Sequence, residues 1–316
     1  MTKASSLYRG RFAPSPSGPL HFGSLVAALG SLLEARSQGG EWLLRMEDVD
    51  APRCSQAAAD SILHTLESFG FAWDGEMVWQ SRRQAAYAEA LEQLTQAGRI
   101  FPCACTRREL ADSLLAADGA VLYPGTCRNG LPAGRPVRAW RVRVDATRIA
   151  FDDAVQGSLT CDLSRQVGDF IVRRADGLFA YQLAVVVDDA AAGITHVVRG
   201  ADLLASTPRQ IFLQRCLGLP TPVHAHLPVA VDAAGEKLSK QTQAQPLDPA
   251  RPGPALWAAL QFLGQAPPPQ LRAASRDELW AWALDHWQLA RVPRQPATPM
   301  TNQLLVRSEP AGDRLE

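Results

Sequence analysis

The sequence predicts an α/β protein built on a parallel sheet, with a loop-rich insertion and a short helical region after it. Three observations lead to this fold class. Strand-like and helix-like stretches alternate over residues 8–97, as they do where helices connect parallel strands. From residue 100 to 130 this periodicity disappears. Alternation then returns as far as residue 241, and two short helix-like stretches rich in tryptophan follow.

The chain is expected to begin with a strand, helix, strand unit. Residues 8–13 are predicted to form the first strand, and residues 24–36 place leucine and alanine at helical spacing. Two glycines at 39–40 end this helix before the apolar run 42–44, which is predicted to be the second strand.

Two more helices are predicted before the insertion. Ser55 is placed to cap the first, because a serine oxygen can accept hydrogen bonds from backbone N–H groups at a helix start. The second is predicted over residues 82–97. Beyond the insertion, residues 137–144 mix apolar residues with arginine, and residues 170–183 suggest two strands around Asp176-Gly177. The remaining expected elements are strands at 194–198 and 227–231 and a helix through 211–213.

These elements divide the chain into five segments. The α/β domain is expected to be discontinuous, because the insertion interrupts it. The segments are residues 1–99, the first half of the α/β domain; 100–135, a metal-binding insertion; 136–241, the rest of the insertion and of the domain; 242–292, helical; and 293–316, a polar tail expected to be disordered.

Composition bounds the possible partners. The 32 lysines and arginines balance 32 aspartates and glutamates, so net charge gives no indication of polyanion binding, and any RNA contact must come from a local basic face. We find no apolar run of membrane-spanning or signal-peptide length, and we therefore expect a cytoplasmic protein that does not contact membranes. Six cysteines in a chain of this length do not indicate a disulfide scaffold.

Two short segments point to an ATP site that activates a carboxylate. Residues 14–24, PSPSGPLHFGS, follow a predicted strand and open a helix, which can present N–H groups and a positive dipole end to phosphate. Residues 237–241, KLSKQ, hold two of the only three lysines in the chain. Alone, the first segment could be an ordinary proline-rich turn and the second a solvated loop. Their combination favours the ATP site.

The two segments resemble the HIGH and KMSKS signatures of class I aminoacyl-tRNA synthetases. Residues 11–15, 44–50 and 198–204 are similar to the glutamyl and glutaminyl branch, and the similarity spans residues 8–241. It implies a Rossmann-like catalytic domain. Because no anticodon-binding region follows, the chain resembles shortened paralogues of glutamyl-tRNA synthetase more specifically. These are implied to transfer glutamate to the queuosine base in the anticodon of tRNA(Asp), not to the 3′ end.

The resemblance implies which residues handle ATP. His21 can hydrogen-bond phosphate, Gly23 lets the nucleotide approach the backbone, and Lys240 can stabilise charge as pyrophosphate leaves. The sequence departs from the two signatures, since Ser24 replaces the second histidine of HIGH and Gln241 the last serine of KMSKS. The expected ATP-binding residues are His21, Gly23, Ser24, Lys237 and Lys240, with His21 and Lys240 in catalytic roles. ATP is expected to bring Mg²⁺ with it.

The resemblance also implies a set of glutamate-binding residues. An arginine can bind a carboxylate through two hydrogen bonds, a carboxylate can accept from the substrate ammonium, and a phenol can orient the ligand. Which arginine binds the side-chain carboxylate stays open. The set is Arg11, Phe12, Ala13, Pro14, Ser15, Glu47, Tyr181 and Arg199.

Cys103, Cys105 and Cys127 crowd into the insertion and suggest a metal site. The resemblance implies that Tyr123 is the fourth ligand of one Zn²⁺. A phenol, with a reference pKa of about 10, must lose its proton to bind a metal. Four protein ligands leave no open coordination position, so the zinc is expected to be structural.

Two other functions are compatible with these residues. The chain could be a truncated glutamyl-tRNA synthetase that charges a 3′ end, or a non-catalytic tRNA-binding paralogue that kept the fold. The short C-terminal region favours transfer to queuosine, and the presence of Arg11, His21, Glu47 and Lys240 favours an enzyme. L-glutamate and tRNA(Asp) are the expected partners, no obligate protein partner is expected, and the chain is expected to be a monomer.

Overall fold

The computed structural model describes residues 7–115, 119, 121–232 and 245–299. Two sets of strands form its central sheet region. β1 (Arg9–Phe12), β2 (Glu41–Met46) and β3 (Val78–Trp79) are parallel, with β2 in the middle. The second set has the order β7-β6-β10-β9 and contains β6 (Arg148–Asp153), β7 (Gly157–Asp162), β9 (His196–Gly200) and β10 (Val223–Leu227).

The two sets meet at β1 and β9. The N–H of Thr195, one residue before β9, donates to the carbonyl of Arg9 over 2.9 Å, and the N–H of Arg9 donates to Thr195 Oγ1 over 2.8 Å. β10 is parallel to both β9 and β6, whereas β6 and β7 form an antiparallel hairpin. The expected α/β fold with a parallel sheet is therefore confirmed.

Helix α1 (Phe22–Ser37) connects β1 to β2 and packs on the sheet. Gly30 permits this close packing, because a Cβ at this position would lie 2.6 Å from Leu227 Cδ1. The C-terminal helices α7 (Pro252–Phe262) and α8 (Arg276–His286) also contact α1. The indole of Trp287, directly after α8, donates to Glu34 of α1 over 2.8 Å.

The other helices lie around the rest of the sheet. α2 (Gln56–Ser68) begins at Ser55, whose Oγ accepts from the N–H of Ala58, so the expected cap is confirmed. A second hydrophobic core joins three helices to the strands of the insertion. These helices are α3 (Gln84–Gln96), α5 (Tyr181–Ala191) and α6 (Thr207–Leu217); α4 (Leu163–Gln166) is a single turn.

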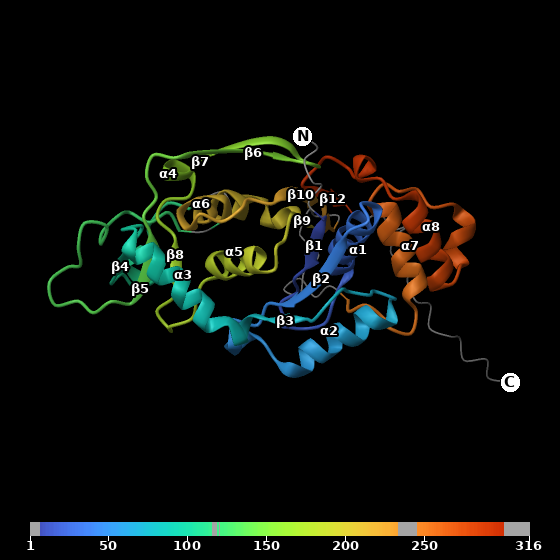
Figure 1. Cartoon of the computed structure of the whole chain (residues 1–316), viewed down its shortest axis with the longest axis horizontal. Helices are drawn as coiled ribbons and strands as arrows, with labels where there is room; N and C mark the ends of the chain where they lie inside the picture. Colours follow the sequence, from blue (N-terminus) through green and yellow to red (C-terminus); the bar gives the residue numbers. More distant parts are fainter. Residues whose placement is uncertain (1–6, 116–118, 120, 233–244, 300–316) are drawn as a thin grey trace.

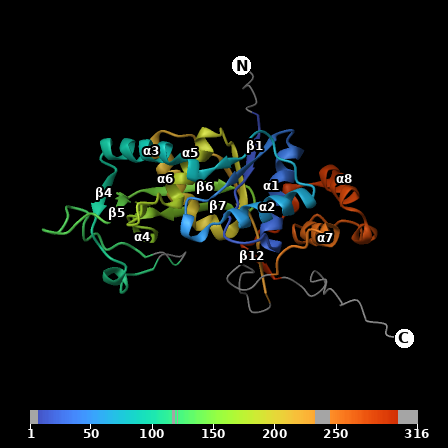
Figure 2. The ribbon, with the colours of Figure 1, turned by 90° about the horizontal axis from the view of Figure 1, so that it is seen from below.

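The insertion has its own small sheet and lies at one end of the molecule. β5 (Ala139–Val142) pairs antiparallel with β4 (Ile100–Cys103) and β8 (Ile171–Arg173). Figures 1 and 2 both place β4 and β5 at one end of the long axis and α7 and α8 at the other, with the parallel strands between them. None of the described helices is long and apolar enough to cross a membrane.

The prediction of two strands over residues 170–183 is half wrong. β8 and the turn are present, with Gly177 at a φ of +85°, but the second strand is reduced to one bridge at Phe179. Helix α5 begins at Tyr181 instead. The predicted strand ends at Leu183, in the first turn of this helix. The helix buries Leu183, Ala184, Val185 and Val186 in succession, so tertiary packing decides its conformation.

The expected disorder of the tail from residue 293 is also wrong for the part that the structure describes. Ala297–Pro299 form strand β12, which pairs in parallel with β11 (Val229–Val231). The N–H of Val229 donates to the carbonyl of Pro296 over 2.9 Å. Residues 300–316 lie outside the described residues.

Candidate active site

A cavity of about 820 Å³ opens at the carboxyl ends of the parallel strands, beside the N-terminus of α1. Segment 13–15 follows β1 directly, Glu47 follows β2, Gly200 ends β9, and segment 228–230 follows β10. Ligands of open α/β sheets bind outside the carboxyl ends of the strands. The topology therefore identifies this cavity as the candidate active site.

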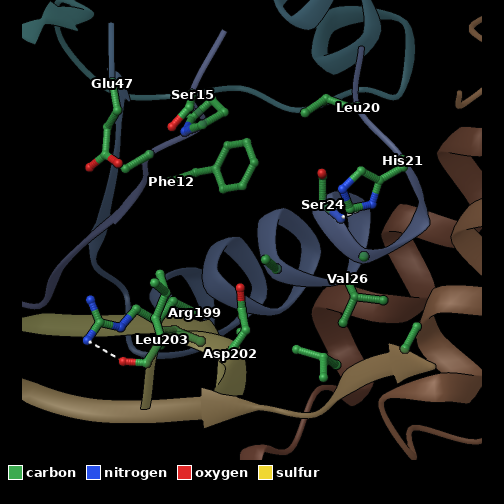
Figure 3. Close-up of a pocket in the computed structure, with 18 of the residues that line it drawn as sticks. Phe12, Ser15, Leu20, His21, Ser24, Val26, Glu47, Arg199, Asp202 and Leu203 are labelled. Atoms are coloured by element: carbon green, nitrogen blue, oxygen red, sulfur yellow. Dashed lines mark hydrogen bonds between the residues drawn. The ribbon is translucent and has the colours of Figure 1, made fainter. Parts of the chain in front are cut away.

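Most of the residues expected from the sequence line this one cavity. In Figure 3, His21 and Ser24 lie on one side of it, and Glu47 and Arg199 lie on the other. Lys237 and Lys240 fall in segment 233–244, outside the described residues. The expected residues in the cavity wall are Arg11, Phe12, Ala13, Pro14, Ser15, His21, Gly23, Ser24, Glu47, Tyr181 and Arg199.

His21 is the N-cap of α1. Its backbone is extended, and its Nδ1 accepts a 3.4 Å hydrogen bond from the N–H of Ser24. His21 therefore caps the helix that contains Gly23 and Ser24. An accepting Nδ1 leaves Nε2 as the proton-bearing nitrogen of a neutral ring. The first turn of α1 contains no acidic residue at this positive end of the helix dipole.

A buried network of charges lies on the side of the cavity opposite His21. Arg11 Nε lies 3.2 Å from Asp189 Oδ1, and Arg45 donates to Asp189 over 2.5 Å and to Glu47 over 3.1 Å. Burial raises the pKa of the Glu47 carboxyl, and the charges of Arg45 and Arg11 oppose this only in part. Burial would raise the pKa of Asp189, but the charges of the same two arginines outweigh burial and lower this pKa.

Arg199 and Tyr181 complete that side. The guanidinium of Arg199 is buried, and its Nη1 has no hydrogen-bond partner among the described residues. Burial lowers its pKa. Tyr181 is the first residue of α5, and burial, followed by the charge of Glu47, raises the pKa of its phenol. A buried donor without a partner costs free energy, so Nη1 is suited to an anionic ligand.

The cysteine cluster lies in the small core of the insertion, which includes Cys103 at the end of β4. Figure 1 shows β4 at one end of the molecule. The Sγ atoms of Cys105 and Cys127 are 3.7 Å apart, and Tyr123 Oη lies 3.5 Å from Cys103 Sγ and 3.6 Å from Cys105 Sγ. The guanidinium of Arg141 lies over the Tyr123 ring, 4.0 Å from its centroid, and donates to Cys103 Sγ.

These separations fit one tetrahedral metal ion. Zn–S bonds of about 2.3 Å and Zn–O bonds of about 2.0 Å set sulfurs about 3.8 Å apart and sulfur about 3.5 Å from oxygen. The three sulfur atoms lie within 4.8 Å of one another. Tyr123 Oη also accepts a 2.7 Å bond from the N–H of Cys127, which fixes the oxygen in place.

The sequence analysis missed several residues of the site. Arg45 and Asp189 support the glutamate side, and each carried a signal, since Arg45 interrupts an apolar run and Asp189 follows the valines of α5. Other missed residues follow β9 and β10 and are recognisable only once those strands are placed. They are Asp202, Leu203, Pro228, Val229 and Ala230.

The fold, the cavity and the chemistry of its wall are those of a class I aminoacyl-tRNA synthetase. The family model "tRNA synthetases class I (E and Q), catalytic domain" matches residues 8–249. The chain is 65% identical over 292 residues to the glutamyl-Q tRNA(Asp) synthetase of Aromatoleum aromaticum, which covers 92% of each chain. It is 64% identical over 293 residues to that of Dechloromonas aromatica, covering 92% of this chain and 97% of the relative. The chain belongs to the glutamyl-Q tRNA(Asp) synthetase family.

A solved structure shares the fold. The glutamate-tRNA synthetase from Elizabethkingia anophelis superimposes with a TM-score of 0.78 at 26% identity, covering 95% of this chain and 69% of that one. The resemblance inferred from the two signature segments is therefore confirmed. The larger synthetase contains a part with no counterpart in this chain.

Proposed function

We propose that the enzyme activates L-glutamate with ATP to form glutamyl-adenylate and transfers the glutamyl group to the queuosine base in the anticodon of tRNA(Asp). One observation carries this proposal. A single cavity combines a helix N-terminus whose first turn has no acidic residue on one side with a buried set of arginines and a carboxylate on the other. The first suits phosphate and the second suits an amino acid with two carboxylates.

Glutamate is proposed to occupy the side formed by Arg11, Glu47, Tyr181 and Arg199, next to residues 12–15. Nη1 of Arg199 has no partner within the part of the chain that the structure describes and can bind a carboxylate, while Arg11 shares its charge with Asp189. Glu47 can accept from the ammonium group. The Tyr181 hydroxyl can orient the ligand between them.

ATP is proposed to bind at the start of α1. His21 Nε2–H and the N–H groups of the first turn can donate to phosphate, near Gly23 and Ser24. Segment 233–244 follows β11, whose residues Val229 and Ala230 line the cavity, and we propose that it supplies Lys237 and Lys240. Mg²⁺ bound to ATP would supply further neutralisation of the phosphate charge.

The proposed reaction has two steps. A carboxylate oxygen of glutamate attacks the α-phosphorus of ATP in line, and the bond to the departing pyrophosphate breaks. A hydroxyl oxygen of queuosine then attacks the carbonyl carbon of the adenylate, loses its proton, and displaces AMP. The protein forms no covalent intermediate, because its contribution is to position the reactants and stabilise charge.

We further propose that Cys103, Cys105, Tyr123 and Cys127 hold one structural Zn²⁺. Support comes from the convergence of three sulfurs and one phenol oxygen at tetrahedral spacing. All four ligands come from the protein, so the ion would stabilise the insertion and take no part in the reaction. Because tRNA is the substrate, we expect the enzyme to act in the cytoplasm, and we expect a monomer.

The test is incorporation of labelled glutamate, with ATP, into tRNA(Asp) that carries queuosine and into the same transcript without it. Nuclease mapping then assigns the label to the anticodon fragment or to the 3′ fragment. Label confined to the anticodon of the queuosine form is expected. Labelling of 3′ ends regardless of queuosine would instead identify a truncated charging enzyme, and labelling of neither would favour a non-catalytic tRNA-binding protein.

A further inference from the structure

Three buried side chains form a relay that ends at Arg199. They come from neighbouring parallel strands, with Asp153 at the end of β6, His226 in β10 and Arg199 in β9. His226 Nδ1 lies 2.5 Å from Asp153 Oδ2, and Arg199 Nε donates to His226 Nε2 over 3.0 Å. The side chains of Asp153 and His226 are fully buried.

The chemistry of the relay allows one arrangement of protons. A guanidinium can only donate, so His226 Nε2 must accept, and the ring proton must therefore sit on Nδ1 and be donated to Asp153. Burial lowers the pKa of His226, which keeps the ring neutral. Asp153 keeps its negative charge, since hydrogen bonds from His226 and backbone N–H groups outweigh burial and lower its pKa.

The relay fixes the plane of the Arg199 guanidinium. Nε is bound to His226, and Nη2 donates to Thr207 Oγ1 over 2.8 Å and to the carbonyl of Leu203 over 3.3 Å. Only Nη1 has no partner among the described residues, and Arg199 lines the cavity. Two of the three guanidinium nitrogens are thus held by the protein, which leaves the third for a ligand.

We propose that Asp153 and His226 are positioning residues for Arg199, holding the guanidinium so that Nη1 meets a carboxylate of glutamate. This inference rests on the proposed activation of glutamate. Neither residue lines the cavity, so both would act through Arg199 alone. Preorganisation of this kind matters because a displacement of about 1 Å can cost a reaction up to about 100-fold in rate.

The two oxygens of Asp153 allow its positioning role to be separated from its structural role. Oδ1 accepts three backbone N–H groups, from Val155, Gln156 and His226, over 2.9 to 3.0 Å. Oδ2 accepts from the His226 ring. Asp153→Asn can keep the first set of bonds through its amide oxygen. Its NH₂ group, however, would donate to Nδ1 and move the ring proton to Nε2, where it faces the Arg199 Nε–H.

The experiment compares four variants by glutamate-dependent ATP–pyrophosphate exchange and by thermal melting. Asp153→Asn and His226→Leu are expected to raise KM for glutamate by about 10- to 100-fold and to leave KM for ATP within about twofold. In His226→Gln, KM for glutamate should return most of the way to the wild-type value, because the amide oxygen of glutamine can accept from Arg199 Nε. His224→Gln is the matched control, a buried histidine of the same strand whose ring lies 6.1 Å from that of His226.

Each outcome has one interpretation. Wild-type KM for glutamate in both Asp153→Asn and His226→Leu would overturn the positioning role and leave the proposed function intact. An equal rise in KM for glutamate in His226→Gln, His226→Leu and His224→Gln, together with a lower melting temperature, would overturn the positioning role in favour of a packing role. Absence of glutamate-dependent exchange in the wild-type protein would overturn the proposed function, and this inference with it.

Discussion

Arg45 Nη1 donates a 2.5 Å hydrogen bond to Asp189 Oδ1, and both side chains are buried. The bond joins β2 of the parallel sheet to α5 of the second core. The same carboxylate accepts from Arg11, whose side chain lines the cavity. One aspartate therefore holds two arginines behind the proposed glutamate site.

Replacing Asp189 with asparagine is expected to destabilise the fold strongly. Asp189→Asn keeps the size of the side chain but removes the negative charge that pairs with the buried guanidinium groups of Arg11 and Arg45. Removing one partner of a buried ion pair costs about 3–5 kcal/mol, and the free energy of unfolding in urea measures it. Glu41→Gln is the control, since its 2.6 Å pair with Arg9 is partly exposed and should change stability by less than about 1 kcal/mol. Equal effects of the two variants would contradict this role of Asp189.

Glutamate use is expected to fall as the pH falls through the raised pKa of Glu47. Below that pKa the carboxyl is protonated and neutral, so it no longer balances the substrate ammonium; above it the carboxylate is charged. The measurement is kcat/KM for glutamate between about pH 5 and 8. Glu47→Gln should show low kcat/KM throughout and lose this part of the pH dependence. A variant that kept the wild-type profile would exclude Glu47 as its source.

Two substitutions of His21 should separate capping from catalysis. His21→Asn keeps a good N-cap but removes the imidazole, so stability should stay near wild type while adenylate formation slows by about 100-fold. His21→Ala should show the same loss of rate and also lose about 1 kcal/mol of stability. Pyrophosphate exchange and urea unfolding provide the two readouts. Full exchange activity in His21→Asn would show that the ring contributes only the cap.

Metal analysis of the purified protein is expected to find one zinc per chain. Cys105→Ser should lose it, because a thiolate ligand is removed. Tyr123→Phe keeps all three sulfurs and should release zinc faster to a chelator. Cys161→Ser, which changes a half-buried thiol in β7, should retain the metal. Unchanged zinc in Cys105→Ser would remove the ligand assignment.

Much of the site could be predicted because its residues follow local patterns. His21 caps α1, the glutamate-side residues 11–15 continue β1, and Glu47 follows β2, so these residues lie in short motifs next to predicted strand and helix ends. Their roles are implied by the resemblance of those motifs to class I synthetases. The cysteines crowd within a short segment. These features depend on residues close together in sequence. The roles of Lys237 and Lys240 stay predictions, because they lie outside the described residues.

What could not be predicted depends on distant contacts. Asp189 reaches Arg11 from 178 residues away, and Asp153 reaches His226 from 73 residues away. Nothing in the local sequence of either partner specifies the other. The second strand predicted within residues 170–183 overlaps only the first turn of α5, and this helix depends on packing against α3 and α6. The pairing of β12 with β11 is likewise absent from any local pattern.

The position of β12 has a consequence for the order in which the protein is made. β11, part of which lines the cavity, pairs with Ala297–Pro299, which come much later in the sequence. The ribosome synthesises from the N-terminus, so the residues of the cavity wall emerge long before the strand that pairs with them. The pairing of β11 can form only after residues 297–299 have been synthesised. A nascent chain stopped before residue 297 would carry every glutamate-side residue of the cavity yet lack this pairing.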